Sequence, residues 1–178
     1  MIPRLETERL VLRALTQADF EPLAGFFGSE AALFVGGPMD RVAAWRQVAA
    51  TAGSWVLRGY GEFAVEEKTS GRLAGLVGPW FPEGWPEPEI AWIVLPEFHR
   101  KGYGYEAAAR AIRFAHEDLG WVTAISCIAA DNLASMKLAE KLGAVREGEA
   151  EFQPYGRFPF FRHLAPAAFA EHIGGSVH

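Results

Sequence analysis

The chain has 178 residues, of which 50% are hydrophobic, and a formal net charge of −5 at pH 7. These values fit one globular domain over residues 1–178 and give no general drive toward nucleic acid or an anionic membrane. The chain starts with charges of both signs rather than a signal peptide, contains no apolar run that could span a bilayer, and has a single cysteine, Cys127. We therefore expect a cytoplasmic protein.

The first part of the chain predicts one strand and two helices. Residues 9–15 form an apolar run typical of a strand. Thr16 opens a pattern that resembles a capping box, so the first helix should begin there. The second helix should begin near Asp40 and end near Gly53, because apolar residues recur at helical spacing between them.

A hairpin and a proline-rich loop follow. Residues 62–67 and 72–78 flank a turn sequence, which is typical of a hairpin. Residues 79–88 contain too many prolines for a central strand and predict a loop. Residues 89–95 alternate between two faces as a strand does. This alternation places Glu89 on an otherwise apolar face.

The middle of the chain contains a strand-loop-helix unit on which our functional interpretation depends. The apolar run stops at Pro96, and the basic residues 99–101 follow. Ala-rich helical sequence then starts after the glycines at 102 and 104. A helix N-terminus carries free N–H groups and partial positive charge, so this loop favours a phosphate or pyrophosphate. The alternative is a tight turn with a solvated basic edge.

The remaining sequence predicts alternating helices and strands. In order, these are a helix over 105–119, a strand over 122–130, a helix from 131 or 132 to 143, and strands over 144–152 and 158–164. Strands and helices alternate only in the middle of the chain. We therefore expect a mixed sheet rather than a wholly parallel one.

Several motifs, in their order and spacing, resemble those of a known family. They occupy residues 89–92, 96–107, 132–135 and 140–143. On these motifs the chain resembles the GNAT superfamily of acyl-CoA-dependent N-acetyltransferases, and most of all the branch that contains ribosomal-protein N-terminal acetyltransferases. The resemblance implies a single-domain α/β (α+β) fold. Its central mixed, mostly antiparallel sheet would have about six to seven strands and be flanked by about four helices.

The resemblance also implies acetyl-CoA as co-substrate, with its pyrophosphate on backbone N–H groups of the loop. The residues concerned are Arg100, Lys101, Gly102, Tyr103, Gly104 and Tyr105. Two positions depart from the family pattern, because the opening Gln or Arg falls on His99 and the first glycine falls on Arg100. A cradle made of backbone N–H groups survives either change.

In the family, the pantetheine arm lies in a V-shaped gap between two parallel strands. By resemblance, these strands are residues 89–95 and 122–130. Backbone groups of Ile93, Val94 and Leu95 would hold the arm and polarise the thioester carbonyl.

Transfer to an amine requires a base, because a primary amine is mostly protonated at neutral pH. Glu89 is our candidate, since a carboxylate on an apolar face has a reason for a raised pKa. A structural carboxylate is the equally weighted alternative. Many relatives place a tyrosine where this chain has Ala139. Ser135 and Asn132 are candidates for contact with the thiol or pantetheine, with helix capping as the alternative.

Other features leave the acceptor open. Cys127 is interpreted as a small core residue, and the spacing of the histidines predicts no metal site. A homodimer is one possible assembly. Trp80, Trp85 and Trp92 are candidates for the acceptor pocket, with ordinary packing as the stronger reading for Trp92. The acceptor is either a protein N-terminus or a small amine. A non-catalytic acyl-CoA-binding module and another kind of nucleotide-binding domain are the alternative classes.

Overall fold

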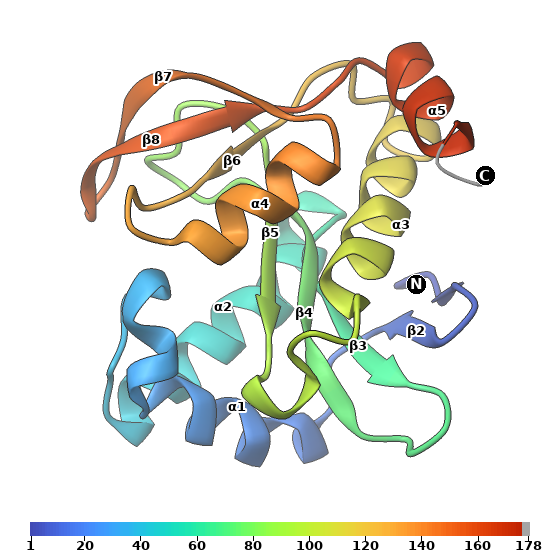
Figure 1. The fold of residues 1–178 in the computed structure, drawn as a ribbon. Coiled ribbons are helices and arrows are strands. Elements are labelled where there is room, and N and C mark those ends of the chain that lie inside the picture. The colour runs from blue at the N-terminus through green and yellow to red at the C-terminus, as the bar shows by residue number, and fades with distance from the viewer. Residues whose placement is uncertain (176–178) are drawn as a thin grey trace.

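The computed structural model describes residues 1–175, and its centre is one sheet that contains eight strands within that range (Figure 1). The strands are β1 (Leu5–Glu6), β2 (Leu10–Arg13), β3 (Phe63–Glu67), β4 (Leu73–Trp80), β5 (Glu89–Val94), β6 (Ile125–Cys127), β7 (Val145–Phe152) and β8 (Gly156–Arg162). Their order across the sheet is β1-β2-β3-β4-β5-β6-β8-β7, and only the β5–β6 pair is parallel. The mixed, mostly antiparallel sheet is thus confirmed, with more strands than predicted.

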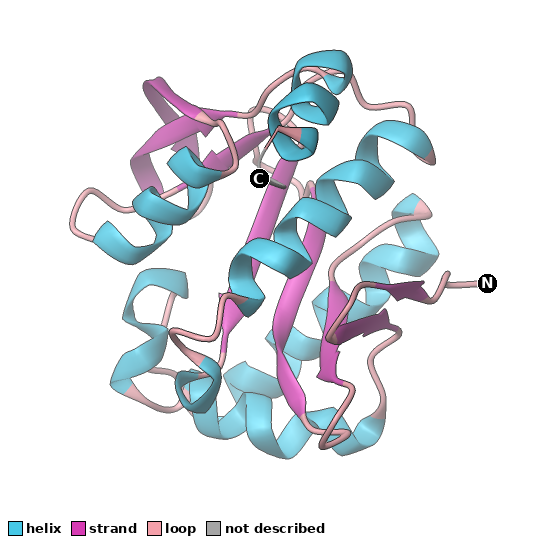
Figure 2. Cartoon of the chain, turned by 45° about the vertical axis from the view of Figure 1, so that its right-hand side comes forward, coloured by secondary structure: helices cyan, strands magenta, loops and turns pink. Residues whose placement is uncertain are grey.

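The α-helices of the described residues are α1 (Phe20–Phe27), α2 (Arg41–Arg58), α3 (Tyr103–Glu117), α4 (Leu133–Lys141) and α5 (Pro166–Gly174). Short 3₁₀ helices are η1 (Gln17–Asp19), η2 (Glu30–Val35) and η3 (Pro96–Phe98). Helix α3 lies across β4 and β5 on one face of the sheet, and α2 passes the other face (Figures 1 and 2). Alanines at 107, 108, 111 and 115 are buried, so α3 can approach the strands closely.

The end of α2 differs from the sequence prediction. Asp40 caps the helix as expected, because its side chain accepts the N–H of Ala43 at 2.8 Å. The helix does not end near Gly53 but continues to Arg58, where Gly59 takes a left-handed conformation. The reason is tertiary: Trp55 packs edge-on against Phe63 at 4.8 Å, which holds the last turn of α2 on the core.

Strand β4 also runs further than predicted, to Trp80. Pro79 lies opposite Ile90 of β5, whereas β3 on the other side reaches only as far as Val77. The proline therefore lies where β4 has no neighbour on its β3 side, so no donor is missing from the ladder. The loop predicted over 79–88 is correspondingly shorter.

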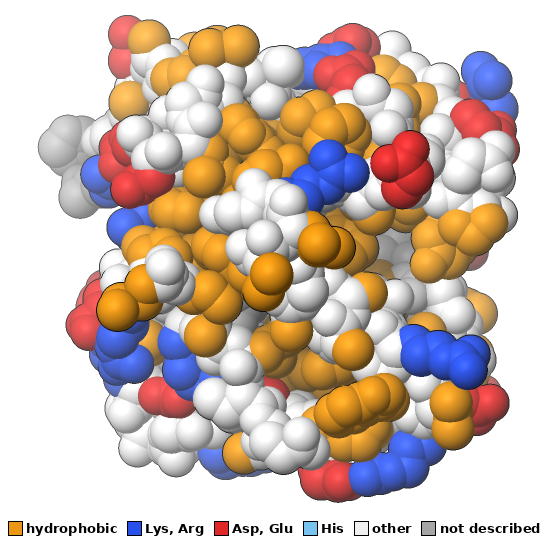
Figure 3. Space-filling view, turned by 180° about the vertical axis from the view of Figure 1, so that it is seen from behind, with side chains coloured by type: hydrophobic (Ala, Val, Ile, Leu, Met, Phe, Trp, Pro, Cys, Tyr) orange, Lys and Arg blue, Asp and Glu red, His pale blue; other side chains and the backbone are white. Residues whose placement is uncertain are grey.

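Three further elements depart from the sequence prediction. Strand β6 covers Ile125–Cys127 only, whereas 122–130 was predicted. Strand β1 and helix α5 were not predicted, because two residues give no alternation and α5 begins at a proline without a side-chain cap. Phe169 of α5 is nonetheless 1% exposed and joins the core. Seen from behind, the surface shows apolar side chains gathered between scattered charged groups (Figure 3).

Candidate active site

The parallel strands β5 and β6 pair at a single position and then part. Glu89 lies opposite Ile125, and the N–H of Ile125 donates to the carbonyl of Pro88 at 2.9 Å. Beyond this point β5 continues to Val94 without pairing with β6, which leaves one edge of β5 open (Figure 1). We call this opening the fork. It lies between the two strands that the family resemblance implied would splay apart.

Side chains replace the ladder bonds that are lost where the fork begins. The backbone N–H of Cys127 donates to Oε1 of Glu89 at 2.7 Å instead of to a strand carbonyl. The Ser126 hydroxyl donates to the carbonyl of Ile90 at 2.6 Å. Because these backbone groups are satisfied by side chains, the strands can separate without leaving buried polar groups unpaired.

The Ser126 hydroxyl is itself held by His163. Nε2 of this histidine lies 2.8 Å from Ser126 Oγ. Since the hydroxyl proton is used toward Ile90, Nε2 must carry the proton that completes this contact. His163 is 3% exposed, and burial lowers its pKa to about 3. The imidazole is therefore neutral at physiological pH and serves as a fixed polar support behind the fork.

The carboxylate of Glu89 lies at the start of the fork and is 6% exposed. Its second oxygen, Oε2, accepts the indole N–H of Trp85 at 2.5 Å. Burial raises the pKa of Glu89 to about 7, although both hydrogen bonds favour the charged form. Trp85 is fixed by edge-on contacts with Phe152 and Tyr155, at 5.5 and 5.7 Å between ring centroids.

Glu62 is a second buried carboxylate near Glu89, and it was not among the residues predicted for the site. It is 5% exposed, and burial together with the charge of Glu89 raises its pKa to about 8. Gly78 of β4 lies beside Glu62, because a Cβ on it would lie 2.8 Å from Cα of Glu62. Gly78 also pairs with Ala91 of β5, two residues from Glu89. A lone glutamate after a turn gives no sequence signal that would distinguish it from a surface residue.

Replacing Glu62 with glutamine should change how stability depends on pH. A raised pKa means that the native state holds its proton longer than the unfolded chain, whose glutamates titrate near 4.5. The stability of the wild type should therefore decline as pH rises from about 4.5 through about 8. In Glu62→Gln this decline should be weaker. Above about pH 8, the free energy of unfolding of the variant should exceed that of the wild type by at least about 1 kcal/mol.

Urea unfolding at pH 5 and pH 9 would measure this effect. The exposed Glu30, replaced by glutamine, is the matched control and should track the wild type at both pH values. An equal pH dependence in Glu62→Gln and wild type would mean that Glu62 ionises as easily in the folded protein as in the unfolded chain.

The loop before α3 presents a helix N-terminus. Gly102 caps α3 in a left-handed conformation with φ of 80°, and the first bond of the helix runs from the N–H of Glu106 to the carbonyl of Gly102 at 3.1 Å. The N–H groups of residues 103–105 precede this bond and have no partner within the helix. Arg100, at the family's glycine position, has φ of 61° and so takes the left-handed backbone that glycine would adopt.

The basic side chains of the loop are largely engaged within the protein. Nε2 of His99 contacts the carbonyl of Val94 at 2.8 Å, and Nζ of Lys101 lies 3.3 Å from Oε1 of Glu67. Arg100 is exposed. An anion at this loop would therefore meet chiefly backbone N–H groups and the helix dipole rather than these side chains.

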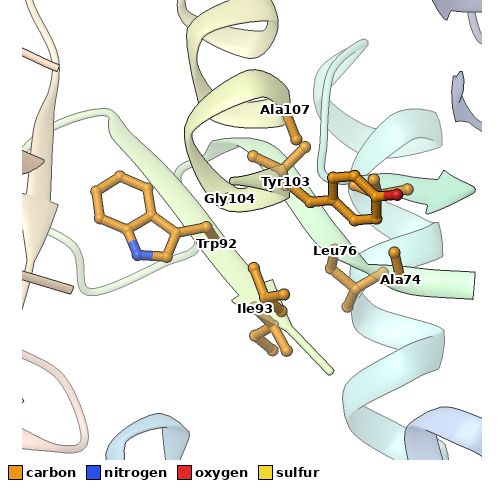
Figure 4. A pocket seen from close by; sticks show the side chains of 10 residues that line it. Ala74, Leu76, Trp92, Ile93, Tyr103, Gly104 and Ala107 are labelled. Carbon is orange, nitrogen blue, oxygen red and sulfur yellow. The ribbon is translucent and has the colours of Figure 1, made fainter. Parts of the chain in front are cut away.

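Gly104 lies where three elements converge. A Cβ on it would lie 3.2 Å from Cδ2 of Leu138 on α4 and 3.3 Å from Cγ2 of Val94 on β5. Figure 4 shows Tyr103 and Gly104 on α3 beside Trp92 and Ile93 of β5, around a narrow apolar pocket. Any side chain at this position would narrow the approach from the fork to the helix N-terminus.

Only one of the three predicted backbone positions on β5 faces the open edge. The N–H of Leu95 donates to the carbonyl of Ala74 at 2.8 Å. The Ile93 carbonyl oxygen lies so near Gly75 that a Cβ there would be 2.0 Å away from it. Both groups face β4 and cannot hold a ligand in the fork, which corrects the prediction for Ile93 and Leu95. The backbone N–H and C=O of Val94 point toward the open edge, because the direction of these groups alternates along a strand.

Asn132 and Ser135 lie at the start of α4, across the fork from β5. Oδ1 of Asn132 accepts the N–H of Ser135 at 3.2 Å, which is the capping role considered as the alternative. The Ser135 hydroxyl accepts the indole N–H of Trp92 at 3.2 Å, so it bridges the two sides of the fork. Ala139, where relatives carry a tyrosine, is fully buried.

Two further observations concern other chemistries. Burial, followed by the charge of Glu89, raises the pKa of the Cys127 thiol to about 12, which is the wrong direction for a nucleophile. Within residues 1–175, no three His, Cys, Asp or Glu side chains gather in an arrangement that could hold a metal ion. None of the helices in that range is long and apolar enough to cross a membrane.

A parallel strand pair that parts beside a helix N-terminus is the arrangement that the resemblance to acyl-CoA-dependent acetyltransferases implied. The model of the acetyltransferase (GNAT) domain matches residues 9–145. The chain belongs to the GNAT family and is an acetyl-CoA-dependent acetyltransferase, as its motifs indicated.

Similar proteins agree with this assignment. The uncharacterized N-acetyltransferase YoaA of Bacillus subtilis (strain 168) is 26% identical over 155 residues, covering 83% of this chain and 86% of YoaA. An acetyltransferase structure from Agrobacterium tumefaciens str. C58 has a TM-score of 0.85 and 29% identity, covering 92% of this chain and 95% of that one. A ribosomal-protein-S5-alanine acetyltransferase from Vibrio fischeri has a TM-score of 0.72 and 16% identity, covering 92% and 97%, and so shares the fold.

Proposed function

We propose that this protein transfers the acetyl group of acetyl-CoA to a primary amine by direct attack in a ternary complex. The observation that carries the proposal is the place of Glu89. Its carboxylate is buried at the start of the fork and is held by the Cys127 N–H and the Trp85 indole. Its pKa of about 7 suits a base that works near neutral pH.

The proton balance follows from this arrangement. The acceptor arrives mostly as an ammonium ion and gives one proton to Glu89, directly or through a water molecule. The neutral amine nitrogen then bonds to the acetyl carbon, and the carbon–sulfur bond breaks as CoA leaves. The second proton that the nitrogen loses on becoming an amide passes to the departing CoA thiolate, directly or through water, and the proton on Glu89 returns to solvent. Cys127 is too basic to be a nucleophile, which favours direct transfer over an acetylated cysteine.

The residues present fit acetyl-CoA. The N–H groups of residues 103–105 offer a cradle for its pyrophosphate, with Gly102 keeping the approach open. On the open edge of β5, the backbone of Val94 and that of Trp92, two residues earlier, would hold the pantetheine arm. The backbone of Trp92 is therefore proposed to contact the arm together with that of Val94, whereas the backbone groups of Ile93 and Leu95 face β4.

Ser135→Ala tests the proposed contact with the thiol end of CoA. The hydroxyl bridges the fork to Trp92, so its loss should lower turnover by about tenfold while acetyl-CoA still binds. Initial rates at saturating acetyl-CoA would measure this. Ser54→Ala, in α2, is the matched control and should leave the rate unchanged. Full activity in Ser135→Ala would leave Ser135 as a helix residue only.

We place the acceptor on the α2 side of the sheet, where Oε2 of Glu62 lies 3.5 Å from the Thr51 hydroxyl of α2. Tyr155, which is 54% exposed, contacts Trp85 and lies 3.5 Å from where a Cβ on Gly36 would be. Exposed apolar residues of η2, Leu33 and Phe34, precede Gly36. A protein N-terminus is favoured by the resemblance to ribosomal-protein acetyltransferases, and a small amine is the competitor.

Isothermal titration with acetyl-CoA, CoA, ATP and NAD tests the proposal first. We expect tight binding of acetyl-CoA and CoA alone, followed by thiol release when an amine is added. ATP or NAD competing for the same loop would contradict it. Binding of CoA without turnover on any peptide or small amine would instead favour a non-catalytic module. The cytoplasmic location and the single domain stay predictions from the sequence.

A further inference from the structure

The N-terminal segment of the chain is hydrogen-bonded to the loop that precedes α3 and to the first turn of this helix. Arg9 lies between β1 and β2, and its Nη1 donates to the carbonyl of Lys101 at 2.9 Å. Its Nε donates to Oε2 of Glu106 at 2.7 Å, and its backbone N–H donates to Oε1 of the same side chain at 2.8 Å. Thr7 adds a hydroxyl bond to Oε1 of Glu106 at 2.6 Å. Residues about a hundred positions apart in sequence are thus joined by four hydrogen bonds.

The Arg9 guanidinium also covers the loop itself. Nη2 would lie 3.3 Å from a Cβ on Gly102, and the guanidinium carbon lies 4.8 Å from the ring centre of Tyr103. The opposite side of the loop is held by Glu67 at the end of β3. Its Oε1 accepts the Tyr103 hydroxyl at 2.6 Å and pairs with Lys101. The loop is therefore held both from the connection between β1 and β2 and from the end of β3.

These contacts set the direction of the peptide group immediately before the proposed cradle of residues 103–105. The carbonyl of Lys101 and the N–H of Gly102 belong to one planar trans peptide and point in opposite directions. Since the carbonyl points toward Arg9, the N–H of Gly102 points away from the N-terminal segment. Arg9 also pairs with the carboxylate of Glu106, in the first turn of α3, and so reduces its repulsion of an anion.

We propose that Arg9 is a positioning residue that pre-forms the pyrophosphate-binding loop for CoA. The proposal rests on CoA binding at this loop. A loop that is already fixed in its binding conformation loses less conformational freedom when the ligand arrives, so affinity rises without a direct contact. Arg9 acts on affinity through the Lys101–Gly102 peptide and through Glu106. It has no direct effect on the step that breaks the bond between the acetyl carbon and sulfur.

Arg9→Ala, compared with the wild type and with Arg113→Ala, tests the proposal. Arg113 pairs with Glu117 at the other end of α3 and is the matched control. Titration with CoA should give a Kd raised at least about tenfold in Arg9→Ala and unchanged in Arg113→Ala. Without ligand, hydrogen exchange at residues 100–106 should be faster in Arg9→Ala, and the rate at saturating acetyl-CoA should stay within about twofold of the wild type.

The outcomes separate the two proposals. If the wild type itself does not bind CoA, the proposed function fails. If the wild type binds CoA and Arg9→Ala binds equally well, the positioning role is overturned. Faster exchange over the whole chain would overturn it too, by showing a general loss of stability. If Arg9→Ala does not fold, Arg9→Lys takes its place in the titration. It retains the charge but not the forked contact, and it should show the same loss of affinity for CoA.

Discussion

Gly104→Val is expected to weaken acetyl-CoA binding by about 100-fold. A Cβ at this position already lies 3.2 Å from Leu138 and 3.3 Å from Val94, and valine adds two methyl groups. They must either push α4 away from β5 or occupy the approach to the helix N-terminus. Both changes disturb the N–H groups that are proposed to hold the pyrophosphate. Isothermal titration with acetyl-CoA measures the loss.

Gly53→Ala is the control for Gly104→Val. Gly53 also lies inside a helix, but a Cβ there has nothing within 4 Å, so this variant should bind acetyl-CoA normally and be slightly more stable. Thermal unfolding of both variants distinguishes a local effect from a general one. Normal affinity in a folded Gly104→Val would place the pyrophosphate elsewhere.

Glu89→Gln is expected to reduce turnover by at least about 100-fold with little change in acetyl-CoA affinity. Glutamine keeps the shape of the side chain but cannot accept a proton from the acceptor. In the wild type, kcat/KM should fall as pH drops below about 7, because protonated Glu89 is no longer a base. In Glu89→Gln this acidic limb should be lost or moved.

Glu83→Gln is the matched control for Glu89→Gln. Glu83→Gln changes a fully exposed carboxylate and should be neutral. The Glu89 carboxylate accepts from both Trp85 and Cys127, whereas an amide has one acceptor oxygen, so Glu89→Gln should also lose some stability. The wild-type pH profile is therefore an independent test. A kcat/KM that stays constant through pH 7 would remove Glu89 as the base.

The candidate site was partly predictable because its local patterns are short-range. The strand-loop-helix unit around the glycines at 102 and 104 follows from an apolar run, a proline and Ala-rich sequence, and α3 begins within two residues of its predicted start. The alternation of residues 89–95 placed Glu89 on an apolar face, and Glu89 is indeed buried. These features depend on neighbours in the sequence.

Features that depend on distant neighbours were missed or placed wrongly. Helix α2 passes Gly53 because Trp55 packs on Phe63, and β4 includes Pro79 because β3 stops before it. Strand β6 is short because it pairs with β8 only from Ile125 to Cys127 and with β5 only at Ile125. The directions of Ile93 and Leu95 follow from pairing with β4, which the sequence of β5 alone does not contain.

The sequence by itself determined the family, the helix N-terminus that is proposed to bind CoA, and a buried carboxylate at the start of β5. The tertiary structure decided what surrounds them. Trp85 donates a hydrogen bond to Glu89, and Glu62 lies close enough for the charge of Glu89 to raise its pKa. Arg9 donates to the loop before α3. The physical reason is range: backbone periodicity and capping act over a few residues, whereas burial, hydrogen-bond partners and pKa depend on segments that meet only when the sheet assembles.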